Sequence, residues 1–395
     1  MKLNRRRIAN IVYFIVVISA FIFIDINVDR DISIPAGGET EEQYNAADVY
    51  MMQPQIDLSR MRVPVKVKGI YLSGYSAGGQ RFYQLLDLIN RTELNAMVID
   101  VKNDSGFVTY KSRDEMVRFV GANQIIQIKD IEKRMAELEK NNVYSIARIV
   151  TFKDNKAAGM RPDLAIKTAS GEVWRDRAGN GWLNPYNRES WEYILRIAEE
   201  AVEFGFDEIQ FDYVRFPTDG NRKIIDYGQA GKDETMEDAI AAFLRYSTDR
   251  LNKKGVYVSA DIFGQVTTNT DDMGLGQQLE KLTASTNILS PMVYPSHYYP
   301  GVYGVAYPDY EPYKIVFTSM DTAYKRIEEL NHEGDKAVLR PWLQDFTASY
   351  LKQGYQVYGP KQVREQIQAT YDSGVEQWLL WNAGNYYTEG ALLKE

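Results

Sequence analysis

Eight short runs rich in β-branched and other apolar residues alternate with amphipathic helical segments after Pro64. The runs lie at 65–72, 96–101, 143–150, 208–212, 256–262, 288–294, 337–343 and 377–382. Helices are predicted between them at 80–90, 131–141, 188–204, 236–254, 275–283, 321–331 and 361–372. This alternation is typical of parallel strands joined by crossover helices. Because the strands number eight over about 320 residues, the sequence predicts a (β/α)8 barrel, the TIM-barrel fold.

The lengths of the connecting segments indicate which end of this barrel carries the function. Long segments at 151–186, 217–235 and 295–320 all follow strands, whereas the segments that precede strands are short. Barrel enzymes place their substrate loops after the strands, at the carboxyl ends. A doubly wound sheet is the alternative fold, but no glycine-rich phosphate loop follows the first strand.

The N-terminal region is predicted to connect the barrel to a membrane. Residues 8–24 carry no charge, and Lys2, Arg5, Arg6 and Arg7 precede them. The length is at the short end for a bilayer span, and the basic flank favours a cytoplasmic N-terminus. We therefore expect a membrane anchor at 1–25, a flexible acidic linker at 26–60 and an extracytoplasmic barrel at 61–395. Secretion after cleavage of 1–25 as a signal peptide is the alternative.

Composition excludes several kinds of chemistry. The chain has no cysteine, which rules out disulfides, thiolate nucleophiles and cysteine-bound metal, and its two histidines are too few for a multi-histidine metal site. A net charge of −8 speaks against a general nucleic-acid binder, because such proteins need a basic face. No cofactor motif accompanies the strands, so we expect a site that works with its own side chains.

Carboxylates dominate the residues at the predicted strand ends. Asp212 ends the fourth strand, where Gln210 shares its inward face by the period of two, and Asp261 occupies the matching end of the fifth. Hydrolysis of a glycosidic bond needs one carboxylic acid to protonate the leaving oxygen and one carboxylate to attack the sugar or activate water. Asp212 and Asp261 are therefore the candidate catalytic residues.

Other polar and aromatic residues at or just past the strand ends are candidates for binding substrate, because flat rings offer sugars an apolar platform with a polar edge. Arg215 is interpreted as a group that holds the Asp212 carboxylate or contacts substrate. Core packing is the alternative role for the two tryptophans, and an ion pair with a turn is the alternative for the aspartate after the second strand. The candidates are Asp100, Lys102, Arg148, Tyr213, Arg215, Tyr294, His297, Trp342, Asp345, Trp381 and Asn382.

Six ordered motifs resemble a glycoside-hydrolase domain family of membrane-anchored or exported bacterial proteins. They are KGIYL at 68–72, VIDVKND at 98–104, WLNP at 182–185, QFDYVRFP at 210–217, SADIFG at 259–264 and SPMVYP at 290–295. The resemblance covers about 65–391 and implies a TIM barrel that acts on carbohydrate. Similarity to retaining barrels with an aspartate at the end of strand four suggests Asp212 as the nucleophile, and the position of Asp261 suggests the acid/base.

Three observations bear on other functions. The segment 205–217 resembles the chitinase strand-four signature, but the proton donor of that signature would fall at Val214 and its middle aspartate at Gln210, so substrate-assisted chemistry is not expected. The sequence GYSAG at 74–78 matches a serine-hydrolase elbow, with Ser76 as nucleophile and an esterase as the implied function. A surface barrel that binds carbohydrate without cleaving it is the remaining alternative.

Overall fold

The computed structural model describes residues 65–330 and 336–394 of the 395-residue chain. All of them belong to one compact unit, Asn45–Glu395. The predicted membrane segment 1–25 and the predicted linker 26–60 lie outside the described residues. Within the described ranges, no helix combines the length and the apolar composition that crossing a bilayer requires.

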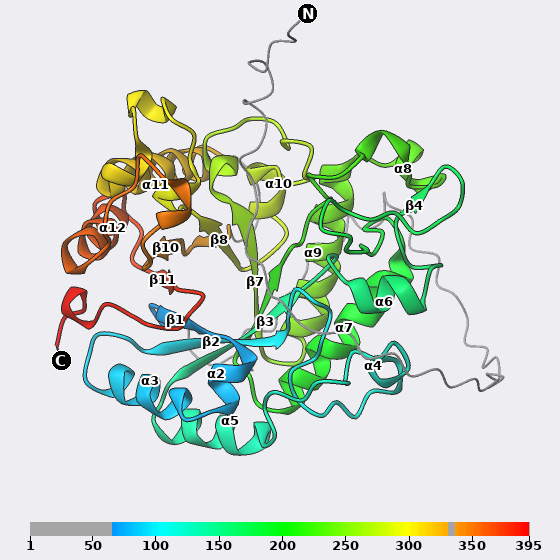
Figure 1. Ribbon diagram of the computed structural model, residues 1–395, viewed down its shortest axis with the longest axis horizontal. Helices are drawn as coiled ribbons and strands as arrows, with labels where there is room; N and C mark the ends of the chain where they lie inside the picture. Colours follow the sequence, from blue (N-terminus) through cyan, green and yellow to red (C-terminus); the bar gives the residue numbers. More distant parts are fainter. Residues whose placement is uncertain (1–64, 331–335, 395) are drawn as a thin grey trace, which may run out of the picture. The chain divides into compact units, whose positions relative to one another are not determined.

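Eight parallel strands close into a barrel (Figure 1). Strand β8 pairs with both β9 and β10, which are two parts of one barrel strand interrupted at 340–341, and this pairing completes the ring. Each of the eight predicted runs contains a strand, so the predicted closed barrel is confirmed. The strands are β1 (Lys68–Leu72), β2 (Ala96–Lys102), β3 (Tyr144–Val150), β5 (Glu208–Asp212), β7 (Tyr257–Phe263), β8 (Ile288–Met292), β9 (Val338–Leu339), β10 (Trp342–Gln344) and β11 (Trp378–Trp381).

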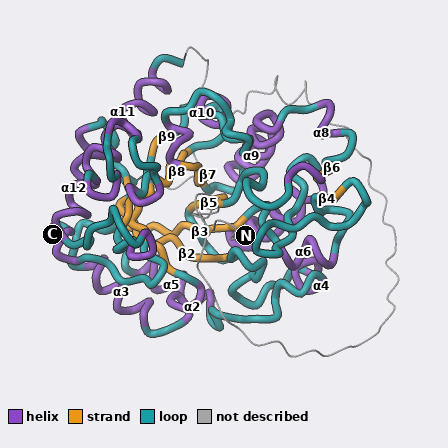
Figure 2. The backbone as a smooth tube through the Cα atoms, turned by 45° about the horizontal axis from the view of Figure 1, so that its top comes forward, coloured by secondary structure: helices purple, strands orange, loops and turns teal. Residues whose placement is uncertain are grey.

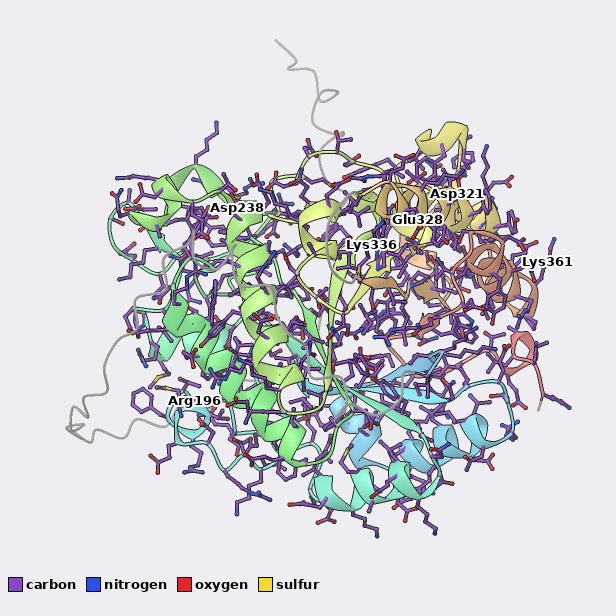
Figure 3. All side chains as sticks on the ribbon, turned by 180° about the vertical axis from the view of Figure 1, so that it is seen from behind. Arg196, Asp238, Asp321, Glu328, Lys336 and Lys361 are labelled. Carbon is purple, nitrogen blue, oxygen red and sulfur yellow. The ribbon has the colours of Figure 1, made fainter. Side chains whose placement is uncertain are left out.

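Helices surround the strands (Figure 2). The longer ones are α3 (Arg81–Asn90), α5 (Ile131–Lys140), α7 (Arg188–Glu203), α9 (Met236–Asn252), α11 (Pro312–Glu328) and α12 (Pro360–Asp372). Shorter elements lie in the loops, namely α2 (Gly74–Gly78), α4 (Glu115–Phe119), α6 (Asn155–Met160), α8 (Ala230–Asp233), α10 (Leu279–Thr283) and the antiparallel pair β4 (Lys167–Thr168) and β6 (Ile225–Asp226). Charged residues such as Arg196 on α7 and Lys361 on α12 occupy the exposed outer faces of these helices (Figure 3).

Helix α7 shows why the sequence folds locally as predicted. The Asn187 side chain accepts a hydrogen bond from the backbone N–H of Glu189, which caps the helix. Trp191, Ile194 and Ala198 recur at helical spacing and are buried against the strands. The apolar face thus fixes the helix on the barrel.

Two helices differ from the predicted bounds. Helix α11 begins at Pro312 rather than at 321, because Ile315 and Met320 extend its buried face and a proline fits the first turn. Helix α10 begins only at Leu279, because Gly274 and Gly276 take left-handed conformations that end any earlier helix.

Side chains alternate between the barrel interior and the helices. Phe211 of β5 contacts Phe243 of α9, with ring centroids 5.1 Å apart. The neighbouring Gln210 points inward, where its amide nitrogen lies 3.4 Å from the Ser290 hydroxyl. This alternation confirms the predicted inward face of β5, and it directs Asp212 to the interior as well.

The serine-elbow motif has a packing explanation. A Cβ at Gly78 would lie 2.0 Å from the Gln127 carbonyl oxygen, and one at Gly74 would lie 2.9 Å from the Thr109 Cβ. Both glycines are therefore required by the close approach of the 103–130 loop. The closed parallel barrel also differs from the open sheet that positions such serines in α/β-hydrolases. The structure thus offers no support for the esterase interpretation.

Candidate active site

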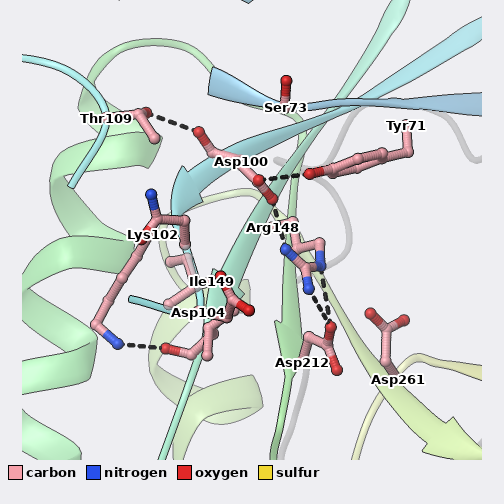
Figure 4. Close-up of polar contacts among 12 residues, drawn as sticks. Tyr71, Ser73, Asp100, Lys102, Asp104, Thr109, Arg148, Ile149, Asp212 and Asp261 are labelled. Carbon is pink, nitrogen blue, oxygen red and sulfur yellow. Dashed lines mark hydrogen bonds and ion pairs between the residues drawn. The ribbon is translucent and has the colours of Figure 1, made fainter. Parts of the chain in front are cut away.

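Asp212 and Asp261 occupy equivalent positions on neighbouring strands. Phe211 of β5 pairs with Ala260 of β7, so the two aspartates are the next residues in the same register. Both side chains point into the barrel at the carboxyl end of the strands (Figure 4). Asp212 is 6% exposed and Asp261 is 2% exposed, so both are buried at this end of the barrel. The structure therefore brings the two candidate catalytic residues together.

Arg148 of β3 links two carboxylates. Its Nε donates to Asp212 Oδ2 at 3.0 Å, its Nη2 donates to the same oxygen, and its Nη1 donates to Asp100 Oδ1 at 2.6 Å. The Tyr71 hydroxyl donates to the other Asp100 oxygen at 2.7 Å. Burial raises the pKa of Asp100, while Arg148 and Tyr71 oppose that rise. Tyr71, Asp100, Arg148 and Asp212 thus form one buried hydrogen-bonded chain.

The backbone after Asp212 is strained. Tyr213 has a positive φ of 49°, an uncommon conformation for a bulky residue. The Tyr213 N–H donates to Asp212 Oδ1 at 2.6 Å, so both oxygens of the carboxylate have donors. Strain of this kind costs about 1–3 kcal/mol and is found mostly at functional sites. The donors on both sides fix the orientation of the Asp212 carboxylate.

Asp261 has a different environment from Asp212. Its Oδ1 accepts a hydrogen bond from Trp342 Nε1 at 2.8 Å. Burial raises the pKa of Asp261 well above its ordinary value of 3.8, and the negative charge of Asp212 adds to the rise. Arg148 and the Trp342 hydrogen bond oppose it. The pair therefore combines a carboxylate in an ion pair with a carboxyl group that favours its protonated form.

Aromatic rings form one wall of the site. Tyr71 stacks on Trp381 with centroids 4.1 Å apart, and Trp342 meets Trp381 edge to face at 5.5 Å. The Arg148 guanidinium lies 5.5 Å from the Trp381 ring centroid. Tyr294 is buried nearby, and burial followed by the charges of Asp261 and Asp212 raises its pKa. The candidates Trp342, Trp381 and Tyr294 therefore lie with the acids.

Two predicted binding residues make contacts that differ from those expected. A register shift in β2 pairs Lys102 with Ile149, which faces the helices, so Lys102 turns out of the barrel. There its fully buried ammonium binds Asp154 at 2.9 Å. Arg215 donates to the Phe216 carbonyl oxygen at 2.9 Å and lies about 5 Å from the ring of Tyr213. The expectation that Arg215 holds Asp212 is corrected, since Arg148 makes that ion pair, and the alternative that Arg215 contacts substrate stays a prediction.

Of the remaining candidates, Asp345 and Asn382 support the C-terminal segment, and His297 lies in the loop after β8. Asp345 accepts hydrogen bonds from the Thr388 N–H and hydroxyl, and Asn382 donates to the Asp345 carbonyl oxygen at 2.6 Å. These contacts hold the C-terminal segment against the end of β10, which is a structural use of both side chains. His297 is exposed, with its ring 5.1 Å from the Tyr294 ring.

Tyr71 is a site residue that the strand-end criterion missed. It lies inside β1 rather than at its end, and only its hydroxyl reaches Asp100. The period of two in β1 could have indicated it, because Gly69, Tyr71 and Ser73 share the inward face. A criterion that included the last inward residue of each strand would have found it.

Removal of Arg148 is expected to destabilise the fold strongly. Arg148→Ala leaves Asp100 and Asp212 buried without their shared cation, and breaking a buried pair in this way costs about 3–5 kcal/mol. Urea unfolding at pH 7 measures the loss. Arg91→Ala is the matched control, because Arg91 forms only exposed ion pairs, which contribute about 0–1 kcal/mol. Equal losses in the two variants would contradict the central role of Arg148.

The sequence and the structure were compared with known proteins. The profile of a family described as "Putative glycosyl hydrolase domain" matches residues 69–387. A solved hypothetical protein from Ruminiclostridium thermocellum is 41% identical, with 49% of this chain and 96% of that chain covered and a TM-score of 0.44. No protein of curated function matches.

Two further solved structures share the fold at low identity. The PgaB (BpsB) glycoside hydrolase domain from Bordetella bronchiseptica is 13% identical, with 82% of this chain and 95% of that chain covered and a TM-score of 0.56. The α-galactosidase TtGalA from Thermus thermophilus, solved with stachyose, is 12% identical, with 87% and 66% covered and a TM-score of 0.51. At these identities the likeness shows the fold alone.

Proposed function

The chain belongs to the family described as "putative glycosyl hydrolase domain", and from this premise we propose that it hydrolyses glycosidic bonds in an extracytoplasmic or cell-wall-associated polysaccharide. Asp212 acts as the nucleophile and Asp261 as the acid/base. The observation that carries the proposal is the placement of two aspartates in register on neighbouring strands with contrasting environments. Pairs of carboxyl groups whose surroundings separate their proton affinities are typical of glycosidases.

The proposed reaction has two steps. The Asp261 carboxyl group donates its proton to the glycosidic oxygen as Asp212 attacks the anomeric carbon, so that the leaving sugar departs as an alcohol and a glycosyl ester remains on Asp212. The Asp261 carboxylate then takes a proton from water, whose oxygen attacks the anomeric carbon and releases Asp212. Both groups return to their starting states.

The spacing of the strands favours retention of anomeric configuration. Neighbouring strands lie about 4.8 Å apart, and Asp212 and Asp261 share one register and one face. Retaining enzymes have carboxyl groups about 5–5.5 Å apart, whereas inverting enzymes need about 6.5–9.5 Å to admit a water. A retaining mechanism is therefore part of the proposal.

The proposed location follows from the residues before the barrel. A membrane anchor at 1–25 and a linker at 26–60 would hold the barrel outside the cytoplasm, within reach of surface polysaccharides. Secretion after cleavage of the first segment would give the barrel the same access. The occurrence of an α-galactosidase and a glycoside hydrolase domain on the same fold supports the carbohydrate substrate by analogy.

The proposal is tested by incubating the full-length chain with purified cell-wall glycans and surface polysaccharides. We expect new reducing ends, and we expect proton NMR of early products to show the anomer of the substrate as the first product. A first product of the opposite anomer would refute retention while leaving hydrolysis in place. Polysaccharide binding without any release of reducing ends would refute the enzyme and favour a binding barrel.

A further inference from the structure

Two loops at the carboxyl ends of the strands are joined into one surface. They are the segment between β8 and α11 and the segment between β10 and α12, the yellow and orange parts of Figure 1. Asp309 of the first loop accepts hydrogen bonds from the Gln344 amide at 3.0 Å and from the Gln356 N–H at 2.9 Å. The Tyr307 ring covers Gly354 so closely that a Cβ there would lie 2.6 Å from it. The two loops therefore hold each other in place.

This surface exposes four tyrosines, which we call the tyrosine rim. Tyr299 is 66% exposed, Tyr307 50%, Tyr310 48% and Tyr350 52%. The Tyr307 and Tyr310 rings meet edge to face with centroids 5.9 Å apart, and the Tyr350 hydroxyl lies 3.2 Å from the Ser296 hydroxyl of the other loop. Large apolar rings that face water in a group mark a binding surface more often than rings scattered singly.

The loops that carry the rim are poor in charge, and the charged residues next to the rim are the buried Asp309 and the exposed Glu311, which flank Tyr310. Residues 282–308 contain no Asp, Glu, Lys or Arg, and Lys352 is the only such residue in 346–360. The whole chain is 25% charged, so these two stretches depart strongly from its average. A surface poor in charge has little means of selecting a charged ligand over a neutral one. Its composition indicates a neutral partner with flat apolar faces.

The rim is continuous with the candidate active site. Tyr294, which is buried near Asp261, has its ring 6.0 Å from the ring of Phe346. The adjacent Ser296 hydroxyl lies 3.2 Å from the Tyr350 hydroxyl. Contacts thus lead from the acids, through residues at the ends of β8 and β10, to the exposed ring of Tyr350.

We propose that the tyrosine rim binds sugar units of a neutral polysaccharide next to the bond that is cleaved, so that the substrate is a long uncharged chain rather than a short or ionic sugar. The C–H faces of sugar rings pack on flat aromatic rings, and the phenol hydroxyls bond to sugar hydroxyls. The inference deepens the proposed function and rests on it for the identity of the substrate. Binding at the rim, however, does not require cleavage.

The test measures binding apart from hydrolysis. Full-length Asp212→Asn protein is run in native gels that contain hydroxyethylcellulose, galactomannan or soluble starch as neutral polymers, and polygalacturonate or glycol chitosan as charged ones. Retardation by at least one neutral polymer is expected. Changing Tyr299 and Tyr350 together to Ala is expected to weaken that binding at least about tenfold, because two stacking contacts are lost. The same pair changed to Phe keeps the rings and is expected to keep most of the binding.

The control is Tyr324→Ala, which removes an exposed tyrosine from α11 outside the two loops and should bind like the parent. Melting temperatures of all variants show whether the loops remain folded. The proposal for the tyrosine rim would be refuted if the double Ala variant bound polymer as well as its parent. It would also be refuted by binding to the charged polymers alone or by no binding to any neutral polymer. A third refuting result is a parent protein that self-associates and binds no polymer, together with a double Ala variant that no longer self-associates. The rim would then be a contact between two copies of the chain. Cleavage by wild type without rim binding would leave the proposed function standing.

Discussion

Asp212→Asn is expected to lower kcat on a cleaved polysaccharide by about 10⁴-fold or more, the scale of loss seen when a covalent nucleophile is removed. An amide in this position cannot form the glycosyl ester that divides the reaction into two steps. The Asn side chain has the volume of Asp, and Arg148 keeps its bond to Asp100, so the fold should persist. Initial rates of reducing-end release, with melting temperatures measured alongside, give the result.

The role of Asp212 as nucleophile can be separated from a structural role. Asp212→Gly opens space beside the anomeric carbon, and added azide can attack from the vacated face to form a glycosyl azide of inverted configuration. Recovery of turnover with azide is expected only if Asp212 supplies the attacking atom. Asp87→Asn, an exposed change on α3, is the control and should keep the parent rate. A normal rate for Asp212→Asn would end the assignment.

The strand pattern allowed most of the fold and the acid pair to be predicted. Parallel strands that are buried on both faces produce continuous apolar runs, and these runs are easy to recognise. An acidic residue that ends such a run, as Asp212 does, stands out because it interrupts the apolar pattern. It does so at the carboxyl end of the strand, where barrel enzymes have their active sites. The equivalent position of Asp261 then follows from counting along the next strand.

The partners of these acids could not be predicted in the same way. Arg148 lies near the end of one predicted strand and Arg215 follows another, and the register of β3 against β2 and β5 decides which guanidinium reaches Asp212. The position of Lys102 depends on a register shift after Asp100 that one sequence does not reveal. Asp345 is similar, because its bond to Thr388 depends on how a distant segment returns to the barrel.

The start of α11 was missed because local composition hid it. The segment before Asp321 is rich in tyrosine, proline and glycine, which indicates a loop, whereas the buried face of the helix includes Ile315 and Val316. Packing of these residues against the barrel therefore extends the helix into a segment whose composition indicates a loop. The same composition produced the exposed tyrosines, so the loop prediction was right for the part before Pro312.

Asp261→Asn is expected to impair the reaction in proportion to how poor the leaving group is. A sugar needs the proton that Asp261 donates, so cleavage of polysaccharide should fall by about 10²–10⁴-fold. A dinitrophenyl glycoside leaves without protonation, so its first step should be much less affected. Comparison of kcat/KM for the two substrates gives the measurement. An equal loss on both would contradict the acid role and point to a general disturbance of the site.

The raised pKa of Asp261 adds a pH test whose sign is fixed. The acid must be protonated to act, so wild-type kcat/KM should fall as pH rises through that raised pKa, and Asp261→Asn should lack this fall.

The free energy of unfolding should depend on pH through the same carboxyl group. Above the ordinary pKa of 3.8, the Asp261 carboxyl is ionised in the unfolded chain but keeps its proton in the folded protein. The free energy of unfolding of wild type therefore falls by about 1.36 kcal/mol per pH unit relative to Asp261→Asn. This fall ends when the pH reaches the raised pKa of the folded protein. Urea unfolding of both proteins between pH 4 and pH 7 should show the difference growing with pH. A constant difference would mean that Asp261 is ionised throughout, and such a group cannot donate the proton.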